Sequence, residues 1–407
     1  MRRFVFSVLS FCFLASCAEE KPKVYEVKEI EFPAGVGASL PVLFSGSELL
    51  ISWVNKPSDS LAVLSYARLK DGKWTSPEQI TQGQNWFVNW ADFPTIVENN
   101  GNLLSHILQK SSPATFSYDV KLSVLPKEQT NWSNGLPLHT DSTQTEHGFV
   151  SAMAYTDSSF FVSWLDGRNT GGGGHSHTGH SAGAMSIRAA AIGLDGRVLW
   201  DELLDAKTCD CCQTSSALTD LGPVVVYRNR SDREIRDIAI IRLVNGKWTE
   251  PGIIHSDGWE IAGCPVNGPK VSAKGKTVLV GWFTAANGAP KVNFAFSGDA
   301  GATFSKPIQL DSAGIIGRVD AALVDEQSGI VSWMQTQGEE TYLLAARVKK
   351  DGKMSTPIPI TTMDPSRKSG FPQLEIHGEQ VYFAWTEVGD ESNRVRTVVL
   401  PKEAFEK

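Results

Sequence analysis

The chain has 407 residues, of which 41% are hydrophobic and 20% are charged, and its formal net charge is −7. This composition is ordinary for a globular protein of ample core size and excludes an intrinsically disordered chain. The acidic balance and the lack of any Lys/Arg cluster argue against nucleic-acid binding, because neutralising phosphates requires a basic face.

The N-terminus has the form of a secretion signal. Two arginines precede an apolar run at residues 4–14, which is too short to span a bilayer, and residues 14–17 read Leu-Ala-Ser-Cys. This ending resembles the lipobox of bacterial lipoproteins, in which the cysteine is acylated and becomes the first residue of the mature chain. A plain signal peptide cut near Ala18 is the alternative.

The lipobox resemblance implies a signal peptide at 1–16, lipidation at Cys17 and a lipidated tether at 17–23. It also implies a cell-envelope protein held to a membrane by its lipid. Ala18 directly after the cysteine favours the outer membrane, facing the periplasm or the cell surface. Residues 24–407 then form the folded part.

Internal repetition is the most informative feature of that part. A short apolar strand with a tryptophan, or a substitute for one, recurs at Trp53, His106, Trp164, Tyr227, Trp282, Trp333 and Trp385. The copies are spaced by 51 to 63 positions, which is typical of a repeat architecture. Tyr227 therefore reads as a packing residue rather than a catalytic one.

Each copy has the elements of a four-stranded sheet. Another strand, often opened by proline, precedes the apolar one, and a third strand follows and runs into an Asp-Gly or Asn-Gly hairpin turn. Six such turns accompany seven copies, and the early segment VYEVKEIEFP can supply the missing outer strand. We therefore expect one all-β domain, a seven-bladed β-propeller closed by an N-terminal strand. A six-bladed propeller is the alternative if the His106 copy is something else.

One turn identifies a wider resemblance. Residues 297–304 read SGDAGATF, which matches the Asp-box, S-x-D-x-G-x-T-[FW], of sialidases and related BNR-repeat proteins. In that superfamily the box is a structural turn on the face away from the active site, so the resemblance implies a fold marker at Asp299 and a sialidase-like propeller. The Arg-Ile-Pro signature of true sialidases is absent from the first blade.

Cysteines form the first candidate site. Cys209, Cys211 and Cys212 lie in the connection that leads into blade four, and Cys264 lies in the one that leads into blade five, so ring geometry should bring the two connections together. Thiolates suit copper first and zinc second. Two disulfides, with no cofactor, are the competing prediction for an exported chain, and a thiol–disulfide catalyst is a third.

A long glycine-rich insertion after Trp164 carries three further candidate metal ligands, His175, His177 and His180. Histidine-rich tracts point to metal by composition, and imidazole suits copper and zinc. A solvated tract with no ligand role is the alternative.

Arginines and tryptophans form the second candidate site, for an anionic or sugar ligand. The arginines expected at the propeller mouth are Arg168, Arg228, Arg230, Arg233 and Arg318. Trp86 and Trp90 are candidate sugar platforms. Structural ion pairs are the competing prediction for each arginine.

Three functions follow from these sites. The first is an envelope lipoprotein with a thiolate-rich, copper-binding mouth for binding, delivery or redox chemistry, with a metal donor as partner. The second is a glycan-binding or sialidase-like glycoside hydrolase, whose acid/base candidates are Glu146, His147, Asp92, Asp320 and Asp364. The third is a non-enzymatic scaffold that presents its tryptophan-rich loop to a partner.

Overall fold

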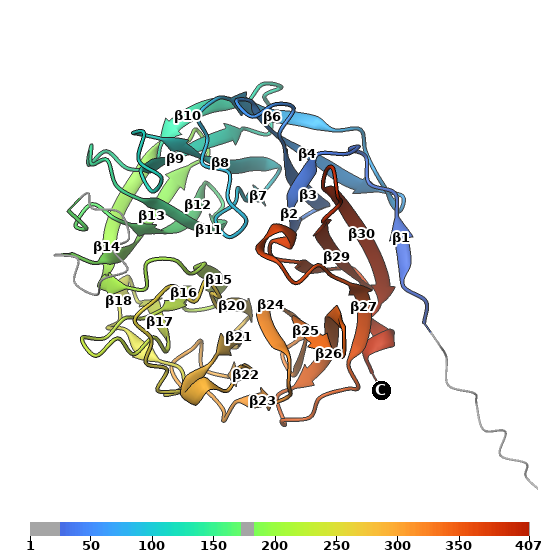
Figure 1. Cartoon of the computed structure of the whole chain (residues 1–407). Coiled ribbons are helices and arrows are strands. Elements are labelled where there is room, and N and C mark those ends of the chain that lie inside the picture. The colour runs from blue at the N-terminus through green and yellow to red at the C-terminus, as the bar shows by residue number, and fades with distance from the viewer. Residues whose placement is uncertain (1–24, 172–182, 407) are drawn as a thin grey trace, which may run out of the picture.

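The computed structural model describes residues 25–171 and 183–406. Within these residues, seven antiparallel sheets stand as blades around a central channel (Figure 1). The helical segments found there are three short 3₁₀ turns, η1 (Ala286–Gly288), η2 (Arg367–Ser369) and η3 (Lys402–Phe405). None of the described helices has the length and apolarity needed to cross a bilayer.

Each blade runs from the channel to the circumference. The innermost strands are β2 (Ala38–Ser45), β7 (Ile96–Asn99), β11 (His147–Thr156), β15 (Ser215–Thr219), β20 (Lys270–Lys274), β24 (Ile315–Asp325) and β28 (Gln373–His377). The second strands are β3 (Leu49–Asn55), β8 (Asn102–Lys110), β12 (Ser159–Asp166), β16 (Gly222–Arg228), β21 (Thr277–Thr284), β25 (Ser328–Gln337) and β29 (Gln380–Glu387).

The third strands are β4 (Ala62–Lys70), β9 (Tyr118–Leu125), β13 (Met185–Gly193), β17 (Ile238–Val244), β22 (Lys291–Ser297), β26 (Glu340–Lys349) and β30 (Arg394–Pro401). The outer strands are β5 (Lys73–Trp74) with β6 (Glu78–Gly83), β10 (Ser133–Pro137), β14 (Val198–Thr208), β18 (Lys247–Trp248) with β19 (Gly252–Ile253), β23 (Ile308–Leu310), β27 (Ile358–Thr362) and β1 (Lys28–Ile30).

The repeated tryptophan position packs the blades together. All seven repeat residues lie on second strands and are buried. Trp164, for example, shares an apolar cluster with Val97 and Leu122 of the preceding blade. His106 lies on β8 within a full four-stranded sheet, so the six-bladed alternative is wrong. Burial lowers the pKa of His106 to about 3, which keeps the ring neutral at this apolar boundary.

The N-terminal strand closes the ring, as predicted. β1 pairs antiparallel with β30, so Lys28 lies opposite Val399 and Ile30 opposite Thr397. The Thr397 hydroxyl donates to the carbonyl oxygen of Ile30 at 2.8 Å and accepts from the Trp74 indole at 3.0 Å. Pairing the two ends covers the sheet edge that an open blade would expose.

The Asp-box is a structural turn between β22 and β23. Asp299 accepts hydrogen bonds from the backbone N–H and hydroxyl of Thr303 at 2.9 and 2.7 Å, and from the Ser297 hydroxyl at 2.7 Å. The Ala300 N–H donates to Lys276 in the β20–β21 hairpin, so the box lies at the hairpin end of the ring. The segments that lead from one blade to the next, which carry the cysteines, lie at the opposite end.

Side chains tie each blade to the next along most of the channel wall. In each tie a backbone N–H on one blade donates to a side-chain oxygen of its neighbour. The ties are Phe149 to Asp92, Ser216 to Ser151, Val271 to Ser215, Leu323 to Ser272, Leu374 to Asp320 and Leu40 to Thr386. The side chains of several polar residues that line the channel are therefore used to hold neighbouring blades together.

Candidate metal centre

The two cysteine-bearing segments lie side by side at one rim of the ring. Gln213 links them, because its side-chain oxygen accepts a hydrogen bond of 2.9 Å from the Gly268 backbone N–H. A Cβ atom on Gly268 would lie 2.3 Å from the Gln213 carbonyl oxygen, so only glycine permits this approach. The prediction that ring geometry brings blades four and five together here is confirmed.

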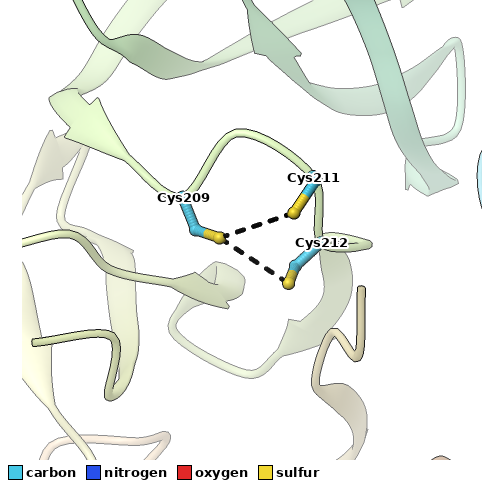
Figure 2. Close-up of side chains that lie close together, drawn as sticks. All are labelled: Cys209, Cys211 and Cys212. Carbon is cyan, nitrogen blue, oxygen red and sulfur yellow. Dashed lines mark hydrogen bonds between the residues drawn. The ribbon is translucent and has the colours of Figure 1, made fainter. Parts of the chain in front are cut away.

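Three thiols gather in the first segment (Figure 2). The sulfur of Cys209 lies 4.0 Å from that of Cys211 and 3.7 Å from that of Cys212. All three sulfurs lie within 4.8 Å of one another, and the three residues are buried. The three are free thiols, contrary to the disulfide alternative. Cys264 is exposed and interacts with Cys211, where it raises the pKa of that thiol.

The sulfur spacing fits a coordinated ion. Ligands about 2.3 Å from a metal lie about 3.8 Å apart in a tetrahedral site and about 4.0 Å apart in a trigonal one. The two measured separations, 3.7 and 4.0 Å, match these edges. A disulfide, in contrast, needs sulfurs about 2.05 Å apart.

The site ionises at Cys209. The pKa of this thiol lies well below the usual value, because its sulfur shares hydrogen bonds with Cys211 and Cys212. Arg236 adds to the shift by donating a hydrogen bond of 3.1 Å to the same sulfur. Burial raises the pKa of Cys212 to about 12, and that of Cys211 is also raised, first by its hydrogen bond with Cys209. Within this cluster, ionisation is therefore favoured at Cys209 over Cys211 and Cys212.

Sequence reasoning missed Arg236. This buried arginine follows β16 within the same arginine-rich stretch as the predicted ones, and it also pairs with Glu234 at 2.6 Å. Its partner Cys209 is 27 positions away and belongs to the segment before β15. The sequence did offer one signal, the arginine-rich segment that contains Arg236, because ring geometry places this segment beside the cysteines.

Apolar side chains surround the thiols. Cys209, Cys211 and Cys212 belong to one buried cluster that includes Met185, Leu165, Ile187 and Tyr227. A dry, weakly polar surrounding suits soft sulfur ligands and strengthens the charge interaction with Arg236. His175, His177 and His180, predicted as further ligands, lie outside the described residues.

The predicted anion-binding arginines are engaged with protein groups. Arg228 is buried and donates to the carbonyl oxygens of Arg236, Asn267 and Phe283 at 2.7 to 2.8 Å. Arg230 pairs with Asp210 at 3.0 Å and Glu234 at 2.9 Å.

The remaining arginines are divided between the interior and the surface. Arg168 pairs with Asp166 at 2.7 Å, and Arg233 is exposed. Arg318 is buried and donates to the Ser369 hydroxyl and the Gly370 carbonyl oxygen. These five arginines do not form a shared clasp, so anion binding by any of them stays a prediction.

The predicted tryptophan platforms differ in access. The Trp90 ring stacks on Phe371 with centroids 5.7 Å apart and lies beneath the guanidinium groups of Arg318 and Arg367. Trp86 lines a surface hollow of about 420 Å³ together with Lys56 and Lys110. Both tryptophans are half-buried, and Trp86 is the one that lines this hollow.

Carboxyl groups line the central channel. Asp92, Asp320 and Glu375 border one cavity of about 240 Å³. Burial raises the pKa of both Asp92 and Glu375 to about 8. Burial also raises the pKa of Asp320, although Lys270 opposes the shift from 3.4 Å. Glu375, which sequence reasoning did not single out, lies on the alternating inward face of β28.

The other acid/base candidates lie elsewhere. Glu146 accepts a hydrogen bond of 2.5 Å from Tyr118, whose hydroxyl also lies 3.2 Å from Asp92, and all three residues are buried. His147 is fully buried beneath the same rim. Asp364 is exposed and caps the backbone N–H of Ser366.

Comparison with known proteins gives distant likenesses only. No protein-family model and no curated protein sequence matches the chain. A protein of unknown function from Dyadobacter fermentans is 13% identical, with a TM-score of 0.48 over 92% of this chain and 98% of that one. An α-L-arabinanase from Penicillium chrysogenum, solved with arabinobiose, is 12% identical, with a TM-score of 0.48 over 93% and 97%. A Hadza microbial sialidase is 12% identical, with a TM-score of 0.47 over 88% and 76%. At this level the likenesses carry no inference about substrate.

Proposed function

We propose that this protein binds a soft metal ion, Cu(I) first and zinc second, through Cys209, Cys211 and Cys212. The observation that carries the proposal is the set of three buried sulfurs at coordination spacing. Two arginine charges, on Arg236 and Arg228, lower the pKa of Cys209 and would offset the excess negative charge of three thiolates around a monovalent ion.

Ligand number favours copper. Soft thiolates select Cu(I) and zinc among biological metals, and structural zinc sites are almost always four-coordinate. The buried set supplies three sulfurs, which suits a trigonal Cu(I) centre. Zinc would need Cys264 as a fourth ligand, and that residue is exposed beside Cys211. The exposed position also offers a route by which a metal donor passes an ion inward.

The setting we propose is the bacterial cell envelope. Lipidation at Cys17, which lies outside the described residues, would tether the propeller to a membrane, with outer-membrane sorting supported by Ala18. Metal storage, delivery to a partner protein or redox chemistry are the roles open to a site of this kind.

The proposal is tested by titrating the reduced protein with Cu(I) under anaerobic conditions, in competition with a Cu(I) chelator. We expect one tightly bound equivalent with a sulfur-only shell in copper X-ray absorption. The control is Cys264→Ser, which should leave Cu(I) affinity within about threefold and weaken zinc binding at least about tenfold. Fully reduced protein that binds no Cu(I), or binds it through nitrogen alone, would contradict the proposal.

A carbohydrate-directed role is the second candidate. The observation that favours it is the channel cavity with three carboxyl groups, of which Asp92 and Glu375 have a pKa raised to about 8. A protonated carboxyl group at neutral pH is what a glycosidase acid requires.

Hydrolysis of aryl sialosides checks this second role. If the channel is catalytic, turnover should fall at least about a hundredfold in Glu375→Gln, which removes the acid while keeping the shape. Glu340→Gln, at an exposed carboxylate on the third strand β26, is the control and should keep full activity. No turnover by the wild-type protein on sialosides, or equal turnover by both variants, counts against the role.

A further inference from the structure

A second cluster of ligand-type side chains lies between blades two and three, away from the thiols. His147 begins β11, Asp166 ends β12, and His139 and Asp141 lie in the segment that joins β10 to β11. His147 and Asp166 are 0% exposed, His139 is 8% exposed, and the Asp141 side chain is 9% exposed. The metal-binding function proposed above uses none of them.

The ring of His147 has a defined orientation. Its Nδ1 lies 3.3 Å from the carbonyl oxygen of Tyr118. Because a carbonyl oxygen can only accept, this contact places a ring hydrogen on Nδ1, so in the neutral ring the lone pair is on Nε2. That Nε2 is buried and has no hydrogen-bond partner among the described residues.

The lone pair faces negative charge. His147 Nε2 lies 3.3 Å from Asp141 Oδ2 and 3.8 Å from Asp166 Oδ1. Both carboxylates accept hydrogen bonds, Asp141 from Thr143 and Asp166 from Arg168, and such bonds favour the ionised form.

A lone pair and two carboxylates that converge in a buried space repel one another unless a cation lies between them. We propose that His147 Nε2, Asp141 and Asp166 bind a divalent cation of the Zn²⁺ type. Nitrogen and oxygen ligands about 2.0–2.2 Å from zinc lie about 3.3–3.6 Å apart in a tetrahedral site, close to the separations present here.

The surrounding contacts have the form of a metal site's outer shell. His139 Nδ1 lies 2.8 Å from Asp141 Oδ2, and Thr143 donates to the other oxygen of the same carboxylate. The Trp164 indole donates to Asp166 Oδ2 at 3.0 Å. Together with the contact between His147 and Tyr118, these bonds orient each proposed ligand, as second-shell partners do in protein metal sites.

Arg168 takes the place of the cation in the present arrangement. Its guanidinium donates to both oxygens of Asp166 at 2.7 and 2.8 Å and lies 3.5 Å from Asp141 Oδ2. The Arg168 side chain is 23% exposed, so it lies on the solvent side of the cluster and can turn outward. An incoming cation would displace it and leave one coordination position open to water.

Cobalt(II) is the probe that tests this site, because Co(II) bound by nitrogen and oxygen lacks the intense charge-transfer bands of Co(II)–thiolate. The loop residues His175, His177 and His180 are replaced by alanine in every protein compared, so they cannot supply ligands. We expect one Co(II) equivalent without thiolate bands, displaceable by Zn²⁺. Asp141→Asn and His147→Gln should weaken this binding at least about tenfold.

His255→Gln is the matched control, since His255 lies 3.8 Å from Asp257 in a more exposed pair and should leave Co(II) binding unchanged. Arg168→Met should tighten binding, a gain that a folding defect cannot produce. Three results would each overturn the proposal. The first is Co(II) binding solely through thiolates, and the second is unchanged Co(II) affinity in the Asp141 and His147 variants. The third is an NMR spectrum in which the His147 ring is protonated on both nitrogens and Zn²⁺ does not displace the proton on Nε2. Failure here leaves Cu(I) binding at the thiols untouched, because the two readouts are separate.

Discussion

Cys209→Ser is expected to abolish tight Cu(I) binding and to raise the dissociation constant at least about a hundredfold. Loss of an outer-shell partner alone can weaken metal binding by up to about a hundredfold, and loss of a ligand should cost at least as much. Cys209 is the group to remove because its sulfur contacts both other thiols and accepts from Arg236. A serine hydroxyl is a hard ligand that does not ionise at neutral pH. Competition titration against a Cu(I) chelator measures the change.

Proton release gives a second measure of the same centre. The pKa of Cys209 lies well below its usual value, whereas the pKa values of Cys211 and Cys212 are raised. Cu(I) binding by all three sulfurs should therefore release protons chiefly from Cys211 and Cys212. Cys264→Ser is the control and should keep both the Cu(I) affinity and the number of protons released. If the Cys209→Ser variant kept the wild-type Cu(I) affinity, the three buried thiols would not be the Cu(I) site.

Arg228→Met should lower the free energy of unfolding by about 3 kcal/mol or more, because three buried carbonyl oxygens lose their charged donor and an unsatisfied buried group costs about 1–3 kcal/mol. Methionine keeps most of the side-chain volume but leaves the carbonyl oxygens of Arg236, Asn267 and Phe283 without their donor. The guanidinium also lies 4.8 Å from the centre of the Trp259 ring, a contact that methionine lacks. Urea denaturation measures the loss.

The same substitution should weaken Cu(I) binding, because Arg228 joins the segment that carries Arg236 to the segment that follows Cys264. Arg233→Met, at an exposed position on the same loop, is the control and should change stability by less than about 0.5 kcal/mol. Equal unfolding curves for the two variants would show that Arg228 does not hold blades four and five together.

The repeat pattern was sufficient for the fold because each blade carries its own local signals. The Trp53 position recurs, hairpin turns recur, and the extra strand at Lys28–Ile30 matches the one missing turn. Side-chain direction at the ends of strands was harder to predict. Arg228 follows the packing position Tyr227, and only the path of the next loop decides whether its guanidinium meets solvent or carbonyl oxygens.

The candidate sites were predictable only in part, for a related reason. Cys209, Cys211 and Cys212 are close in sequence, so composition revealed them. The contact of Arg236 with Cys209 depends on how separate loops meet at the rim, and no periodicity encodes it. His147 and Asp166, in contrast, lie opposite each other on the paired strands β11 and β12, whose register the sequence did not reveal. His147 was singled out as an acid or base, whereas its geometry indicates a ligand whose neighbours come from two blades.

Closure by β1 has a consequence for how the protein is made. The hydrogen bond from the Thr397 hydroxyl to the Ile30 carbonyl oxygen joins residues 367 positions apart. The N-terminal strand β1 therefore has no partner until the C-terminal strand β30 has been synthesised. The first six blades can therefore form before the seventh is complete. Pairing β1 with β30 closes the longest loop in the chain and so has a large loop-closure entropy cost. Until this final step the seventh blade has an unpaired outer edge, which another strand could join.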